Sequence, residues 1–334
     1  MPKNSVIPVF IPHAGCPHDC VFCDQRRISG HASPPAPEEV SEIIGSAVGK
    51  LSASAELAFY GGSFTCLPLE DQRAYLEAAA PFLLSGAVSR IRVSTRPDAV
   101  SVEILNLLSS HGVETVELGA QSLNDGVLAK ANRGHLAADV ENASRLVKAS
   151  GLKLILQLMF GLPGDTPQSA AESCRRAAAL SPDGVRFYPV VVLRGTALYD
   201  MMLRGEYSPL SVGDAVSLCA GVLPIFTEKN IPVIRLGLNP TDELSGGAAV
   251  AGAYHPAFGE LTWSRYFLNL AFSKLEKLEV RGKTVTLGVH PSRLSVMAGQ
   301  HRCNTLALKE RFSPGKIRIV PANVTENELS VAVG

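Results

Sequence analysis

Three cysteines stand close together near the start of the chain, in the stretch IPHAGCPHDCVFCDQ. Cys16, Cys20 and Cys23 have the spacing C-x3-C-x2-C. Cysteine thiolates hold zinc ions and iron–sulfur clusters. Structural zinc takes four nitrogen or sulfur ligands, so a zinc site would need His13 or His18 as its fourth ligand. A [4Fe–4S] cluster held by three cysteines keeps one iron free of protein ligands, and that iron can bind a substrate. The residue types alone leave both readings open.

The composition is that of a globular protein with a large core. Of the 334 residues, 46% are hydrophobic and 19% are charged, which excludes extensive disorder. The 31 basic residues balance the 31 acidic ones, so a globally basic nucleic-acid-binding protein is not indicated. We find no signal peptide and no run that could span a bilayer, and we expect a cytoplasmic protein without a membrane partner. Seven cysteines in such a compartment are expected to be reduced, which disfavours a disulfide.

Short apolar runs alternate with helical patterns over residues 5–190. The predicted strands are VIPVF, ELAFY, RIRVS, TVELGA, LKLILQLMF and GVRFYPVVV, and a helical pattern follows each of them. Six strand–helix units in series predict an α/β fold with a parallel sheet and right-handed crossovers. Periodicity does not decide between a barrel, a partial barrel and a doubly wound open sheet.

The polar and glycine-rich stretches all follow predicted strands. They are HAGCPHDCVFC, GGSFT, STRPD, AQS, FGLPGD and YPVVVLRG, whereas the opposite connections, such as SHGVE and SGLK, are short. In an α/β barrel the carboxyl ends of the strands form the rim that carries the active site. We therefore predict a barrel with one composite site, built from all six strands.

The chain changes character past residue 231. The glycine-rich stretch LGLNPTDELSGGAAVAGAYHPAFGE predicts a long loop over the barrel mouth. A helix over 261–278 and the strands KTVTLGV, KIRIV and ELSVAV follow. We predict a barrel domain over 1–240, and a lid loop with a small α+β domain over 241–334. Between Arg281 and Arg318 eight lysines or arginines accompany one acid, Glu310. This segment suits either a phosphate-rich partner such as RNA or ordinary solvation.

The C-x3-C-x2-C loop directly after the first strand of a six-unit β/α barrel resembles the radical S-adenosylmethionine (radical SAM) enzymes. The resemblance implies a partial (β/α)6 TIM-like barrel of the radical SAM type with a small C-terminal α+β appendage. It implies a [4Fe–4S] cluster on Cys16, Cys20 and Cys23, with S-adenosylmethionine on the open iron. In that family one electron from the cluster cleaves the sulfonium and yields a 5′-deoxyadenosyl radical. A low-potential electron donor, such as flavodoxin or ferredoxin, is implied as a partner.

The same resemblance predicts the residues near the methionine and adenine parts of the cofactor. Phe22 matches an aromatic position that the family has just before the third cysteine. Gly61, Gly62 and Ser63 lie where the family holds the methionine ammonium with backbone carbonyls. Two glycines also let a ligand approach the backbone closely.

The stretch LGAQSLNDGVLAKANRGH resembles oxygen-independent coproporphyrinogen oxidases and their relatives. Their glutamine and arginine in this stretch contact S-adenosylmethionine, which implies the same role for Gln121 and Arg133. A guanidinium suits the carboxylate, and an amide can bond ribose or carboxylate. Many relatives carry a glutamate and an aspartate where this chain has Ser94 and Gln157, so these two predicted ribose contacts depart from the family pattern.

The stretches STRPD, ELGAQS, NRGH, GLPG and FYPVVVLRGTALYDMMLRGEY resemble, in order and spacing, the catalytic subunit of Elongator, a radical SAM enzyme that modifies wobble uridine in transfer RNA. The resemblance covers residues 6–240, and the acetyltransferase-like domain of Elongator is not expected here. It implies a radical SAM enzyme with transfer RNA as a candidate substrate. The charge of the basic 281–318 segment, and not the resemblance, suggests where transfer RNA would bind. The alternatives are a porphyrin-like small molecule as substrate, or a non-catalytic iron–sulfur redox or binding protein. Candidate substrate residues are Tyr188, Arg194, Tyr254 and His255.

Overall fold

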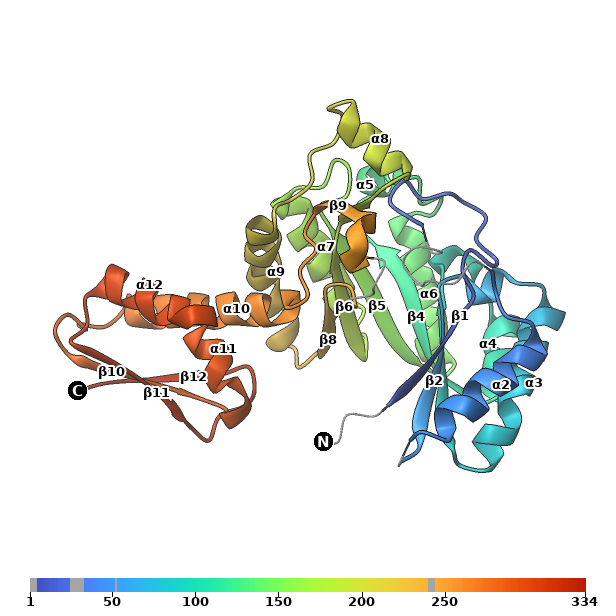
Figure 1. The fold of residues 1–334 in the computed structure, drawn as a ribbon, viewed down its shortest axis with the longest axis horizontal. Helices are drawn as coiled ribbons and strands as arrows, with labels where there is room; N and C mark the ends of the chain where they lie inside the picture. The colour runs from blue at the N-terminus through green and yellow to red at the C-terminus, as the bar shows by residue number, and fades with distance from the viewer. Residues whose placement is uncertain (1–4, 25–32, 52, 240–243) are drawn as a thin grey trace.

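A computed structural model describes residues 5–24, 33–51, 53–239 and 244–334. Its larger sheet has seven strands in the order β1-β2-β3-β4-β5-β6-β8, and all neighbours pair in parallel. These strands are β1 (Val6–Phe10), β2 (Ala55–Tyr60), β3 (Val88–Thr95), β4 (Val113–Gln121), β5 (Lys153–Phe160), β6 (Gly184–Pro189) and β8 (Val233–Leu236). The sheet curls into a half-barrel, and helices cover its outer face (Figure 1). The predicted partial barrel is confirmed.

The covering helices begin at residues whose side chains suit a helix start. Ser101, Thr166 and Ser211 each accept a hydrogen bond from the backbone N–H three residues further along, which satisfies a donor that the helix itself leaves unpaired. The helices that follow the strands are α2 (Pro37–Val48), α3 (Leu69–Leu84), α4 (Val102–Ser110), α6 (Ala137–Ala149), α7 (Pro167–Ala179) and α9 (Val212–Thr227). None of the described helices is long and apolar enough to cross a membrane.

The two faces of the sheet differ in chemistry. Toward the helices the strands present fully buried apolar side chains, such as Leu57, Val93 and Leu118. Alternate positions point into the half-barrel, and there Glu56 and Glu117 are buried carboxylates. Strands covered on both faces are usually apolar throughout. The polar inner face therefore marks the interior of the half-barrel as the place for a ligand.

The path after the fifth strand differs from the prediction in two ways. The stretch GVRFYPVVV is not one strand: β6 ends at Pro189, and β7 (Val191–Leu193) pairs with β9 (Ala249–Gly252) in a separate antiparallel ribbon. Its neighbour β5 ends at Phe160, and Gly161 turns away with a φ of 83°, so a longer β6 would have no partner there. The seventh strand, β8, lies where the prediction placed the beginning of the irregular region.

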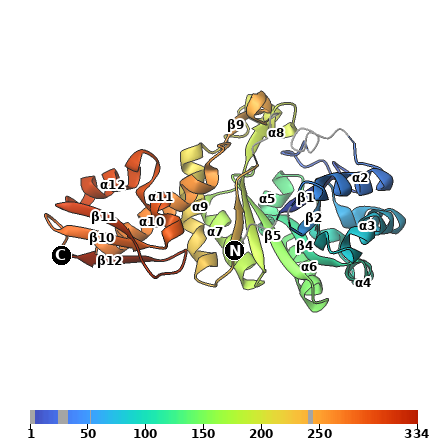
Figure 2. The same ribbon diagram turned by 60° about the horizontal axis from the view of Figure 1, so that its bottom comes forward.

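The C-terminal part carries its own sheet, of order β11-β10-β12, as the three predicted strands and helix suggested. Its elements are α10 (Phe258–Leu275), β10 (Thr284–Val289), α11 (Leu294–Ala298), α12 (Cys303–Phe312), β11 (Lys316–Pro321) and β12 (Leu329–Val333). Helix α10 packs along α9 and joins this part to the half-barrel, at the end opposite to α2 and α3 (Figure 2). Of the predicted lid loop, residues 240–243 lie outside the described residues, and part of the rest forms β9. The predicted boundary at residue 240 stays a prediction.

Candidate functional site

A cavity of about 640 Å³ lies inside the half-barrel and reaches its carboxyl rim. Its lining joins segments that are far apart in the sequence, from the cysteine loop to β8. The predicted site residues among the lining are Cys16, Phe22, Cys23, Gly61, Gly62, Ser63, Ser94, Gln121, Arg133, Gln157 and Tyr188. The predicted residues come from the first six strands or the loops behind them, and β8 adds Arg235 to the lining.

The cysteine loop is held from two sides. The N–H of Val21 donates to the carbonyl of Ala131 at 3.1 Å, and Nδ2 of Asn132 donates to the carbonyl of Asp19 at 2.8 Å. From the other side, the N–H of Leu198, in α8 (Ala197–Leu203), donates to the carbonyl of Val21 at 2.7 Å. These bonds fix the backbone between the second and third cysteines, so the thiols are carried by an ordered loop.

Two glycines allow the close approach of neighbouring loops. A Cβ on Gly62 would lie 2.3 Å from the carbonyl oxygen of Ala14 and 2.5 Å from that of Ile11, so only glycine lets the β2 rim pack against the start of the cysteine loop. A Cβ on Gly134 would lie 2.3 Å from Nε2 of His18. The His18 ring, considered above as a zinc ligand, therefore packs on the glycine of the NRGH stretch.

The three thiols occupy different surroundings. Cys20 is buried, and Nη1 of Arg133 donates to its Sγ at 3.2 Å, while Cys16 and Cys23 line the cavity. Burial, and then the neighbouring thiols of Cys20 and Cys16, raise the pKa of the Cys23 thiol to about 12. Within the described ranges, no three histidine, cysteine or acidic side chains converge on a point that would hold one metal ion. A cluster spreads its thiolates over several irons, and a soft thiolate set suits iron and sulfur.

Two polar atoms in the cavity wall fit a ligand with hydrogen-bonding groups. Arg133 also donates from Nη2 to the carbonyl of Gly119 at 2.7 Å, but its Nε is buried without a hydrogen-bond partner among the described residues. The hydroxyl of Ser94 is also buried without a hydrogen-bond partner among the described residues. Buried polar groups normally have partners, so such an atom calls for an explanation. The carboxylate and ribose hydroxyls of S-adenosylmethionine are suitable partners, and the residues present fit this cofactor.

Arg133 is itself positioned by Arg96, which the sequence did not single out. Arg96 is buried, and its Nη2 donates to the backbone carbonyl of Arg133. Both oxygens of Asp98 accept from this guanidinium at 3.0 Å. The backbone N–H of Arg96 donates to Oγ of Ser63 at 3.0 Å. The hydroxyl of Ser63 therefore stabilises the wall of the site. Through Arg96, the STRPD stretch connects the loop after β2 to the loop after β4.

The end of β4 has an unusual backbone. Gln121 has a φ of 63°, a left-handed conformation that residues other than glycine seldom adopt. Its Oε1 accepts a hydrogen bond from Nε2 of Gln157 at 3.1 Å. Such strain concentrates at functional sites, where the surrounding structure enforces it. Both amides line the cavity in an arrangement that the protein maintains against a local conformational cost.

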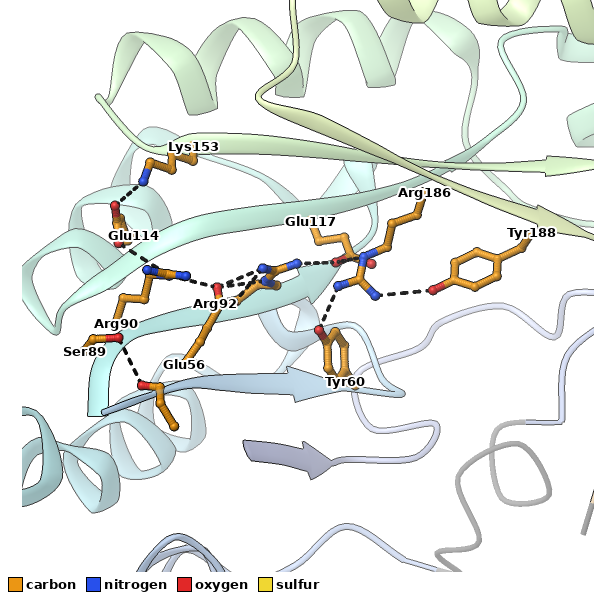
Figure 3. A network of polar contacts seen from close by, with 11 residues as sticks. Glu56, Tyr60, Ser89, Arg90, Arg92, Glu114, Glu117, Lys153, Arg186 and Tyr188 are labelled. Carbon is orange, nitrogen blue, oxygen red and sulfur yellow. Dashed lines mark hydrogen bonds and ion pairs between the residues drawn. The ribbon is translucent and has the colours of Figure 1, made fainter. Parts of the chain in front are cut away.

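A buried ionic network crosses the inner face of the half-barrel (Figure 3). Glu56 accepts from Arg92 at 2.8 Å and lies 3.3 Å from the guanidinium of Arg90. Glu117 lies 3.5 Å from Arg92 and 3.1 Å from Arg186, so the charges alternate across β2, β3, β4 and β6. Removing one partner of such a pair leaves the other charge buried and uncompensated. The network therefore fixes Arg186 in the floor of the cavity.

Arg186 orients two phenols. It donates to the hydroxyl oxygens of Tyr60 at 3.0 Å and Tyr188 at 3.3 Å. Burial raises the pKa of both phenols, so each keeps its proton. Because the oxygens accept from Arg186, the hydroxyl hydrogens are free to donate elsewhere. Arg235 also lines the cavity, and burial lowers its pKa. This side of the cavity offers hydrogen-bond donors and a cation.

Three predicted substrate residues lie outside the cavity lining. Arg194 stacks on the ring of Tyr199, 5.9 Å from its centroid, and Tyr254 packs on an apolar group that includes Val191. His255 accepts at Nδ1 from the N–H of Ala257 at 3.0 Å. Residues missed by sequence reasoning line the cavity instead, and they are Tyr60, Glu117, Arg186 and Arg235. Their only signal was a polar residue at an inward position of an otherwise apolar strand.

Comparison with known proteins identifies the class that this fold and site define. Residues 10–177 match the family model described as the Radical SAM superfamily, and residues 182–266 match the Radical_SAM C-terminal domain. The chain belongs to the radical SAM superfamily and is an enzyme of the radical SAM class, as the sequence predicted.

Within that superfamily the chain is Elongator-like. It is 31% identical over 191 residues to human Elongator complex protein 3, which is 51% of this chain and 35% of that protein. It is 36% identical over 129 residues to the tRNA uridine(34) acetyltransferase of Methanocaldococcus infernus, which is 38% of this chain and 24% of that enzyme. The chain thus spans about a third or less of both. An uncharacterised protein of Methanocaldococcus jannaschii is 32% identical over 65% of this chain and 70% of its own length.

Solved structures share this fold. The structure of M. infernus Elp3 with an N-terminal deletion superposes with a TM-score of 0.59 and 24% identity, covering 82% of this chain and 63% of that one. The maturase HydG superposes with a TM-score of 0.55 and 15% identity, over 78% of this chain and 55% of that one. At these identities the likeness shows a shared fold.

Proposed function

We propose that this protein cleaves S-adenosylmethionine reductively at a [4Fe–4S] cluster held by Cys16, Cys20 and Cys23. The observation that carries the proposal is the contact of Arg133 with both Cys20 and the cavity wall, in the same cavity as the buried hydroxyl of Ser94. When bound, the cluster supplies one electron, and S-adenosylmethionine supplies the 5′-deoxyadenosyl group that carries the radical.

The chain's own residues bind and orient the cofactor in this proposal. Arg133 binds the methionine carboxylate, because a guanidinium forms charge-assisted bonds with carboxylates. The carbonyls at Gly61 and Gly62 receive the ammonium, and Phe22 covers the adenine. Ser63 shapes the loop that presents those carbonyls. The hydroxyl of Ser94 and the amides of Gln121 and Gln157 bond the ribose.

The substrate occupies the opposite side of the same cavity. Tyr60 and Tyr188 donate from their hydroxyls, and Arg235 contributes a positive charge, so the bound group carries carbonyl or anionic oxygens. Arg186 holds both phenols in place. Arg194, Tyr254 and His255 are further from this position, and we propose them as contacts for the outer part of a larger substrate.

We propose transfer RNA as that substrate. A pyrimidine base offers the carbonyl oxygens that two phenols can bind, and the related tRNA uridine(34) acetyltransferase acts on a uridine, as its name states. A low-potential donor such as flavodoxin or ferredoxin supplies the electron. A small molecule with carboxylates, such as a porphyrin precursor, is the second candidate, since Arg235 in the cavity suits a carboxylate.

The experiment is an anaerobic assay of the reconstituted enzyme with dithionite and S-adenosylmethionine. Bulk transfer RNA and a tetracarboxylate porphyrinogen are added in separate arms, and 5′-deoxyadenosine and nucleoside masses are measured. Acceleration by transfer RNA together with a nucleoside of changed mass supports the proposal. Acceleration by the porphyrinogen alone overturns transfer RNA as the substrate.

The predicted subsite is tested in the same assay with the Tyr188→Phe variant. The substrate-dependent acceleration should fall about tenfold, because one hydrogen bond to the substrate is lost. Tyr75→Phe removes an equivalent hydroxyl that binds Pro35 outside the cavity, and it should leave the acceleration unchanged. Equal effects of the two substitutions would contradict the assignment of the subsite.

A further inference from the structure

The C-terminal part contains a strand–helix–helix–strand unit that the matched family models, which end at residue 266, do not reach. Strands β10 and β11 are parallel and in register from Thr284–Lys316 to Val289–Pro321. Helices α11 and α12 connect them, and β12 pairs antiparallel with β10 on the other side. Figure 1 shows the two helices on one face of this small sheet.

The two helices are joined by a tight turn, Gly299-Gln300-His301-Arg302. Gly299, His301 and Arg302 have φ values of 77°, 51° and 62°, so three of the four residues are left-handed. A Cβ on Gly299 would lie 2.5 Å from Sγ of Cys303, which explains the glycine. The side chains of Gln300, His301 and Arg302 are exposed. The turn therefore presents its backbone and three polar side chains to solvent.

A buried asparagine fixes this turn in place. Nδ2 of Asn304 lies within hydrogen-bonding distance of the carbonyl and hydroxyl of Ser264, at 2.9 and 3.0 Å, and of the carbonyl of Met297 at 3.1 Å. These contacts tie the start of α12 to both α10 and α11. A rigid turn loses little conformational freedom on binding a ligand, which favours affinity.

This order of elements is that of the KH module, in which a Gly-X-X-Gly turn between two helices clamps the backbone of single-stranded nucleic acid. Gly299 occupies the position of the first glycine. Arg302 stands where the second glycine would be and adopts a left-handed conformation. The turn therefore keeps its shape and also carries a cation. Leu306, one helical turn further along α12, is 60% exposed and offers an apolar surface for bases beside Arg302.

The charge of the unit suits the same partner. Of the eight cations between residues 281 and 318, Arg293 pairs with Glu326 and Arg311 with Glu276. The others are exposed and have no ion pair within the part of the chain that the structure describes: Arg281, Lys283, Arg302, Lys309, Lys316 and Arg318. Lys316 and Arg318 point to the same face of β11, which is an edge strand. Such cations bind phosphates with release of counterions.

We infer that the C-terminal unit binds single-stranded RNA, with the turn 299–302 holding the sugar–phosphate backbone and the cations of β11 flanking it. The inference deepens the proposed function by naming the part of the chain that holds a nucleic-acid substrate. It does not depend on the radical chemistry, because the turn and the cavity are separate and each can be tested without the other.

The test measures binding of a fluorescently labelled single-stranded RNA to the full chain by anisotropy, with an RNA duplex of the same length as comparison. The single strand should bind more tightly than the duplex. The double variant Gln300→Asp/His301→Asp should weaken single-strand binding about tenfold or more, because two carboxylates then face the phosphates. Ser109→Asp/Ser110→Asp adds the same charge at exposed positions on α4 and should change the affinity less than about twofold.

Two further measurements separate RNA binding by the turn from the radical chemistry of the cavity. Formation of 5′-deoxyadenosine without RNA should be the same in the wild type and the turn variant. Arg302→Gly places a glycine at a left-handed position, so it should fold as the wild type does and lower the salt dependence of binding by about one phosphate contact. Equal binding of single strand and duplex, equal loss in both double variants, or an unchanged salt dependence in Arg302→Gly would each overturn the inference.

Discussion

Arg133 donates a hydrogen bond from Nη1 to Sγ of Cys20 at 3.2 Å, and its backbone carbonyl accepts one from Arg96. One arginine therefore touches a predicted cluster ligand while it lines the cavity for the predicted cofactor. The second and third strands position it through Arg96. We conclude that Arg133 joins the cysteine loop to the wall of the cavity.

Arg133→Ala should weaken binding of S-adenosylmethionine while the protein keeps its iron. A lost charge-assisted bond is worth about 1.5–3 kcal/mol, so the dissociation constant should rise roughly ten- to a hundredfold. Calorimetry on the reconstituted protein measures the affinity, and an iron assay measures the cluster. Arg145→Ala, on the exposed side of α6, is the matched control and should leave both unchanged. Unchanged affinity in Arg133→Ala would refute its role.

Cys20→Ala should abolish iron binding and 5′-deoxyadenosine formation together, because a thiolate ligand is lost. Cys303→Ala removes an exposed thiol far from the cavity and should retain both properties. Iron content and 5′-deoxyadenosine are measured on the same preparations. A Cys20→Ala protein that retains cleavage would show that this cysteine is not a ligand.

Gly62→Ala should displace the cysteine loop, because the added Cβ would lie 2.3 Å from the Ala14 carbonyl. Overpacking of this kind costs about 1–3 kcal/mol. Chemical denaturation should show that loss, and reconstitution should yield less iron. Gly221→Ala, in α9, has open space around its Cβ and should be neutral or slightly stabilising. Similar results for the two substitutions would contradict the close packing of these loops.

His135 should make the protein less stable as the pH falls. Burial, and then the charges of Arg133 and Arg96, lower its pKa from 6.5 to about 4. Between these values the unfolded chain binds a proton that the folded chain does not, so the stability rises with pH across this window. The difference amounts to at most about 3 kcal/mol.

Denaturation of His135→Gln against pH tests this point. The variant should lose the part of the slope between pH 4 and 6.5 that belongs to this residue. An identical slope in the wild type and the variant would mean that His135 takes up its proton equally in both states. The control is His111→Gln, at the end of α4, where the ring is not deeply buried.

The half-barrel and its rim were predictable because they rest on local patterns. Each strand run, each helix start and the glycine pair at residues 61 and 62 is a pattern of a few consecutive residues. The rim motifs follow the strands, so parallel strands bring them together whatever the details of the packing. The spacing of the cysteines was visible in the sequence, whereas the roles of Arg133, Gln121 and Gln157 were implied by the resemblance to radical SAM enzymes and stay predictions.

The interior network was not predictable in this way. Glu56 meets Arg92 from 36 positions away, and Arg186 meets Tyr60 across the half-barrel. A single polar residue in a strand does not show which partner it has. The seventh strand, β8, was missed because four residues are too short a run to show a period, and their place in the sheet depends on pairing with the edge of β6.

The most direct test of the central claim is the formation of 5′-deoxyadenosine by the protein reconstituted with iron and sulfide without oxygen. Dithionite and S-adenosylmethionine are added, and the product is quantified for the wild type and for a variant in which Cys16, Cys20 and Cys23 are alanine. We predict 5′-deoxyadenosine from the wild type and none from the variant. A wild-type protein that yields no product, and that carries bound zinc and no iron, would contradict the account.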